Sequence, residues 1–115
     1  MFSVFLDEIK IGTTKLENRD SSMGVAFGKI NIINKEFDYD FIKKFCIEND
    51  IEINFDDNNQ KLISTRNISN FKIFKTSNNI EIESEIGCNL EGMNEEGFQI
   101  TVLGISNSFF EKELL

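Results

Sequence analysis

The chain has 115 residues, 40% of them hydrophobic, and its 20 acidic and 12 basic side chains give a net charge of −8. The length favours one α+β domain over residues 1–115, large enough to bury an ordinary hydrophobic core. The acidic surplus argues against nucleic acid and anionic membrane surfaces as partners, because binding to either needs clustered lysine and arginine. With no secretory leader and no apolar run of membrane-spanning length, we expect a cytoplasmic protein.

The first third of the chain predicts strands and one loop. Apolar residues alternate with other side chains over residues 2–17 on both sides of an Asp7-Glu8 turn, which indicates a β-hairpin. Gly12 in its second strand suggests a bulge or a close backbone approach. By composition, residues 18–24 are predicted to be a loop, and residues 25–33 form a second apolar segment.

One main helix is predicted from Asp38 to Asn49. Asp38 is a suitable N-cap, and Asn49 suits a C-terminal stop. Between them, apolar residues repeat at i and i+4 and form one stripe, made by Phe41, Ile42, Phe45 and Cys46.

The remainder predicts strands separated by polar turns. Strands are expected at residues 51–55, 62–65, 71–76, 80–86 and 98–105, with turns at 56–59, 67–70, 77–79 and 92–97. The stretch 80–86 alternates most strictly and places Glu81, Glu83 and Glu85 on one face. A short helix is expected from Ser106 onward, with Phe110 and Leu114 one turn apart and docked on the body of the domain.

Short connections imply antiparallel pairing between successive strands. The predicted fold is therefore α+β: a mostly antiparallel curved sheet or small open barrel packed on one main helix, with a short C-terminal helix.

Catalytic and metal-binding patterns are missing from the sequence. The chain has no His, which nucleophilic triads use as their base, and its two cysteines, Cys46 and Cys88, suit small buried residues in reduced form. The run Asp56-Asp57-Asn58-Asn59 resembles part of a calcium loop, but it lacks the central Gly and the closing Glu, and turn chemistry explains it. We therefore expect no cofactor, no metal and no enzymatic activity.

The row Glu81, Glu83 and Glu85 is the first candidate site. Such a row arises on any solvated strand face, where it discourages aggregation, but it also offers a binding face to a basic protein partner. Acid–base chemistry by paired carboxylates is a further alternative.

A second candidate comes from residues 16–28, Leu-Glu-Asn-Arg-Asp-Ser-Ser-Met-Gly-Val-Ala-Phe-Gly. This segment resembles small uncharacterised bacterial proteins in which a strand ending in Leu-Glu is followed by Asp-Pro-Pro-Met-Gly-Val-Ala and a glycine. The resemblance covers 13 of the 115 residues, with serines in place of both prolines. It implies a bacterial source and a conformationally demanding loop, and no activity. The candidate functional loop comprises Asp20, Ser21, Ser22, Met23 and Gly24; alternatively it is a structural turn with Met23 and Gly24 packed under the sheet.

The leading hypothesis is a non-catalytic protein-binding domain that turns an acidic face toward a basic partner. Its concrete form is a bacterial toxin-neutralising (immunity) protein. One alternative is a structural domain that forms a homodimer through its C-terminal helix. The other is a small carboxylate-based ligand-binding protein or metal-dependent enzyme.

Overall fold

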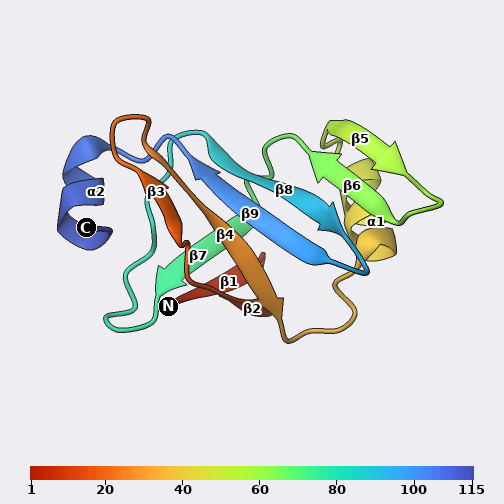
Figure 1. Cartoon of the computed structure of the whole chain (residues 1–115), viewed down its shortest axis with the longest axis horizontal. Coiled ribbons are helices and arrows are strands. Elements are labelled where there is room, and N and C mark those ends of the chain that lie inside the picture. Colours follow the sequence, from red (N-terminus) through yellow and green to blue (C-terminus); the bar gives the residue numbers. More distant parts are fainter.

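The computed structural model describes residues 1–115 and contains nine strands in one antiparallel sheet and two helices (Figure 1). The strands are β1 (Phe2–Leu6), β2 (Ile9–Thr14), β3 (Asn18–Asp20), β4 (Val25–Ile32), β5 (Ile53–Asp57), β6 (Leu62–Thr65), β7 (Phe71–Lys75), β8 (Gly87–Met93) and β9 (Gly97–Leu103), and the helices are α1 (Tyr39–Glu48) and α2 (Asn107–Glu113). The spatial order is β5-β6-β8-β9-β4-β2-β1-β7, and β3 pairs with β4 outside this path. The predicted α+β class with a curved antiparallel sheet is confirmed.

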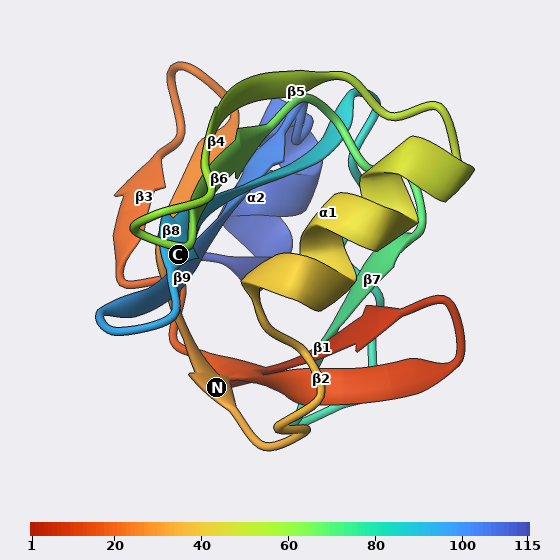
Figure 2. The same ribbon diagram turned by 90° about the vertical axis from the view of Figure 1, so that its right-hand side faces the viewer.

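The sheet curls at β4, the strand that connects β5, β6, β8 and β9 on one side with β2, β1 and β7 on the other. Residues 26–29 of this strand pair with β9, whereas residues 30–32 pair with β2. As a result β1, β2 and β7 turn back under the rest of the sheet, and α1 lies in the concave space between them (Figure 2). Helix α2 lies toward the opposite end of the long axis (Figure 1). One continuous cluster of buried apolar residues fills the interior.

The N-terminal hairpin forms as predicted, with Asp7 and Glu8 as a two-residue turn. A bulge interrupts it after Val4, and an added Cβ at Gly12 would lie 2.1 Å from the carbonyl oxygen of Asn31. Both a bulge and a close backbone approach therefore occur at this glycine.

Helix α1 also forms as predicted. The Asp38 carboxylate accepts a hydrogen bond from the Phe41 backbone N–H at 3.0 Å, and Asn49 is the C-cap. The face toward the sheet buries Tyr39, Ile42 and Cys46, whereas Ile47 points outward with 63% of its surface exposed.

Four local predictions are wrong, and one of them is the turn at 92–97: Gly92 and Met93 belong to β8, and Gly97 belongs to β9. Residues 80–86 form no strand: only one bridge joins Glu81 to β7, and the strand begins at Gly87 instead. Residues 18–20, predicted as loop, form β3 against β4. Asp56 and Asp57, predicted as turn, belong to β5, where they pair with Ile63 and Leu62 of β6.

Helix α2 docks on its own domain, as expected. Ser106 caps it, and Phe110 and Leu114 are almost completely buried. Two basic side chains hold its C-terminal end: Arg19 donates to the Leu114 carbonyl at 2.7 Å, and Lys75 donates to the Glu113 carbonyl at 2.9 Å. Neither α1 nor α2 has the length and apolar character that a membrane crossing needs.

Candidate functional site

A hollow of about 380 Å³ lies where the chain crosses from β7 to β8, and we call it the acidic hollow. It is lined by Ser69, Phe71, Lys72, Ile73, residues 81–88 and Val102. The lining includes all three carboxylates of the predicted row, Glu81, Glu83 and Glu85, and each of these residues is exposed. The row therefore borders a concavity, although the segment that carries it is not a strand.

Backbone hydrogen bonds hold this segment at both ends. The Ile82 N–H donates to the Ile73 carbonyl of β7 at 2.8 Å, and the Glu85 N–H donates to the Gly104 carbonyl at 3.0 Å. Between them, the Ser84 hydroxyl donates to the Leu103 carbonyl and accepts from the Gly87 N–H. With Ile82 buried and Ser84 engaged inward, the alternating glutamates are directed to solvent.

The acidic hollow combines anionic groups with an apolar floor. Buried side chains of Phe71, Ile73, Ile82, Cys88 and Val102 contribute to its lining. None of the three glutamates forms an ion pair within the chain. Such a surface suits a basic side chain, because the alkyl stem contacts apolar groups while the charged head lies near carboxylates.

The loop Asp20–Gly24 is a compact turn. The Asp20 carboxylate accepts hydrogen bonds from the Ser22 hydroxyl at 2.6 Å and the Met23 N–H at 3.2 Å, which lowers the pKa of this carboxyl. The Gly24 carbonyl accepts from the Ile105 N–H at 3.0 Å. Gly24 is buried against the chain as the structural alternative predicts, but Met23 does not pack under the sheet, since 70% of its surface is exposed.

Backbone contacts explain two glycines of the segment 16–28. Gly24 has a φ of +65°, and an added Cβ would lie 2.5 Å from the Ile105 carbonyl oxygen. At Gly28 an added Cβ would lie 2.8 Å from the Cα of Leu16, a completely buried residue. Both positions therefore need glycine for packing. The structure does not bring this loop together with the acidic hollow in any shared lining.

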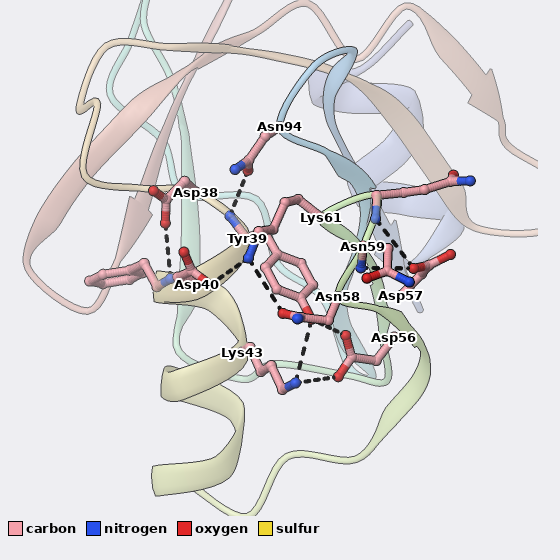
Figure 3. A network of polar contacts seen from close by, with 12 residues as sticks. Asp38, Tyr39, Asp40, Lys43, Asp56, Asp57, Asn58, Asn59, Lys61 and Asn94 are labelled. Atoms are coloured by element: carbon pink, nitrogen blue, oxygen red, sulfur yellow. Dashed lines mark hydrogen bonds and ion pairs between the residues drawn. The ribbon is translucent and has the colours of Figure 1, made fainter.

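The densest polar network was not predicted from the sequence. Tyr39 at the start of α1 donates its hydroxyl to Asp56 of β5, and Lys43 forms an ion pair with the same carboxylate at 2.8 Å (Figure 3). Lys61 lies over the Tyr39 ring at 5.2 Å from its centroid. The Tyr39 N–H donates to the Asn94 side chain at 2.8 Å. These contacts join α1 to the β5–β6 hairpin and to the β8–β9 turn.

The network keeps each group in its ordinary charge state. Hydrogen bonds from Lys43 and Tyr39 lower the pKa of Asp56, and the hydrogen bond to Asp56 raises the pKa of Lys43. Burial, followed by the bond to Asp56, raises the pKa of Tyr39. A neutral phenol, a carboxylate and an ammonium that satisfy one another act as a structural junction. One signal in the sequence could have revealed it: Tyr39 is the only tyrosine in a core rich in phenylalanine, and a buried hydroxyl needs a partner.

Both cysteines are buried and unpaired, and burial raises the pKa of Cys46 and that of Cys88, the latter to about 12. No three Cys, Asp or Glu side chains converge closely enough to hold a metal ion. Comparisons with protein-family models, curated proteins and solved structures give no significant match. The resemblance of residues 16–28 to small bacterial proteins thus stays a prediction.

Proposed function

We propose that this chain is a non-catalytic protein-binding domain whose acidic hollow receives a basic segment of another protein. The observation that carries the proposal is the position of Glu81, Glu83 and Glu85, three exposed carboxylates without internal ion pairs around an apolar floor. Lysine and arginine side chains match both parts of this surface. The overall charge of −8 would also accelerate the encounter with a positively charged partner.

In its concrete form the proposal is a bacterial immunity protein that neutralises a basic toxin domain in the cytoplasm. The small size, the acidic charge and the resemblance of residues 16–28 to bacterial proteins support this form. A homodimer through the C-terminal helix has less support. Phe110 and Leu114 are buried within the chain, which leaves half-buried Phe109 and exposed Leu115 for a second copy.

The test compares two triple variants with equal changes in net charge. One carries Glu→Gln at residues 81, 83 and 85. The matched control carries Glu→Gln at residues 8, 36 and 96, which are exposed and lie outside the acidic hollow. Each protein is used to capture partners from lysate of the source organism at low and high salt.

We expect the wild type and the control to retain one basic protein, and the variant at residues 81, 83 and 85 to bind it at least about tenfold more weakly. Higher salt should weaken the wild-type complex. If that protein is toxic when expressed alone, co-expression of the wild-type chain should restore growth. Equal capture by both triple variants, or no captured partner at all, would refute the proposal.

A further inference from the structure

The sheet has a surface that neither helix covers, on the side of β4, β8 and β9 that faces away from α1 and α2 (Figure 2). Burial alternates along these three strands, with even-numbered residues directed into the core, so their odd-numbered residues form this surface. We call it the outer face. Most of its residues are half-buried, and four of them are apolar: Val25, Phe27, Met93 and Leu103.

Charged side chains are scarce on the outer face. In the whole chain 28% of the residues are charged and the net charge is −8, whereas on the outer face only Lys29 and Glu91 are charged, and their charges cancel. A depletion of charged residues, together with aromatic side chains and methionine, distinguishes the core of a protein interface from the rest of the surface. Two copies of an acidic chain also repel each other least where both present a neutral surface.

The two charges of the outer face lie on either side of Gln99. In the sheet register, Gln99 of β9 pairs with Glu91 of β8 on one side and with Lys29 of β4 on the other. The Gln99 amide lies 3.4 Å from the Glu91 carboxylate. The Lys29 side chain lies over β9, with Nζ 3.7 Å from the point that a Cβ on Gly97 would occupy. Neither Lys29 nor Glu91 forms an ion pair within the chain.

This arrangement of charges is self-complementary. A two-fold axis that runs along β9 through Gln99 exchanges the two sides of the outer face, and it therefore places Glu91 of each copy opposite Lys29 of the other. Leu103 lies further along the same strand and would contact Leu103 of the second copy. A two-fold dimer needs such a surface, because the same patch of both subunits has to match itself.

We propose that the chain forms a homodimer in which the outer faces of two copies pack against each other as a β-sandwich. Two ion pairs between Glu91 and Lys29 flank Gln99 at the dimer axis, and Phe27 and Leu103 become further buried. The sheet is concave toward α1, so the outer face is convex and the contact is limited to its central strands (Figure 2). A small interface of this kind gives a weak, reversible dimer.

The proposed dimer does not rest on the role of the acidic hollow, because Glu81, Glu83 and Glu85 lie outside the outer face. Helix α2 takes no part in it either. Failure of the proposed binding function would therefore leave the dimer standing, and failure of the dimer would leave the binding function standing.

The first test measures and locates self-association of the full chain. Sedimentation equilibrium from about 1 μM to about 1 mM covers the range in which a weak dimer dissociates. ¹H–¹⁵N NMR spectra over the same range locate the contact. We expect an increase toward twice the monomer mass, with concentration-dependent shifts at the backbone amides of Phe27, Gln99 and Thr101 and none in α1 or α2.

The second test exchanges the two charges. Lys29→Glu and Glu91→Lys each place like charges opposite each other twice in the dimer, so each should weaken dimerisation by at least about tenfold. The double variant Lys29→Glu/Glu91→Lys restores both ion pairs and should dimerise within about threefold of the wild type. Glu91→Lys is the sharper single variant, because it weakens the dimer although it lowers the net negative charge of each copy.

Matched controls change the net charge by the same amounts elsewhere. Lys35→Glu and Glu36→Lys lie in the exposed segment between β4 and α1 and should alter dimerisation by less than about threefold. All four substituted positions are exposed, and the urea midpoint of each variant shows that it is folded.

Three outcomes would overturn the proposal. These are a monomer at every concentration, concentration-dependent shifts that fall outside the outer face, and a double variant that dimerises no more tightly than the single variants.

Discussion

Arg19 joins the two ends of the chain, so its removal should destabilise the whole domain. Its guanidinium donates to the carbonyls of Lys15, Leu16 and Leu114 at 3.1, 2.9 and 2.7 Å, and it lies 5.5 Å from the centre of the Phe2 ring. At a partly exposed site each of these hydrogen bonds contributes about 1 kcal/mol, and the ring contact adds about 0.5 kcal/mol. Arg19→Met should therefore lower the free energy of unfolding by about 3 kcal/mol, or Tm by about 10 °C.

The other arginine provides the control. Arg66 forms one ion pair with Glu52 at 3.6 Å, and both side chains are mostly exposed, so Arg66→Met should change stability by less than about 0.5 kcal/mol. Urea unfolding followed by circular dichroism measures both variants. Hydrogen exchange of the Leu114 amide, which donates to the Phe110 carbonyl, reports on the end of α2 and should accelerate with Arg19→Met. Wild-type stability and unchanged exchange in Arg19→Met would refute this reasoning.

Three further predictions concern the network, the loop and the thiols. Because the pKa of Asp56 is lowered in the folded state, its contribution to stability is complete above the unfolded-state pKa of about 4 and is lost as the pH falls through the lower folded-state pKa. Asp56→Asn should therefore lower the urea midpoint at neutral pH and unfold at nearly the wild-type midpoint near pH ~2. An equal deficit at both pH values would contradict this prediction. Gly24→Ala should destabilise the domain by at least about 2 kcal/mol in thermal unfolding, because the new Cβ would clash with the Ile105 carbonyl and the backbone has a positive φ. A change below about 0.5 kcal/mol would show that the loop adjusts freely. Burial and the raised pKa should keep Cys46 and Cys88 unreactive toward a thiol reagent until urea unfolds the chain, and fast labelling of the native protein would show that a thiol is accessible.

Local signals predicted the elements whose ends are marked in the sequence itself. The cap at Asp38 and the apolar stripe after it are enough to define α1, and the hairpin around Asp7 follows from alternation on both sides of one turn. The stretch 80–86 shows where such signals fail. Its glutamates are exposed and Ile82 is buried, as alternation implies, but Ser84 binds the carbonyl of Leu103 in a strand that is distant in sequence. No local sequence pattern predicts the contact between Ser84 and Leu103.

The candidate sites also combine features that the local sequence predicts with features that depend on the tertiary structure. Glu81, Glu83 and Glu85 stand out in the sequence because their spacing is regular, whereas the hollow beside them needs β7 and β8 to be placed first. A register shift lies between Ile53 and Phe55 at the start of β5, and 54% of the Phe55 surface is exposed.

Because β4 pairs with both β2 and β9, its place in the sheet affects how the chain folds during synthesis. Ala26 in this strand pairs with Val102 in β9, so the centre of the sheet joins segments made early and late. During translation the first four strands emerge long before β9, and their apolar faces stay exposed until β9 has been synthesised. We expect folding over milliseconds to seconds, as is usual for β-rich topologies dominated by pairings between distant segments.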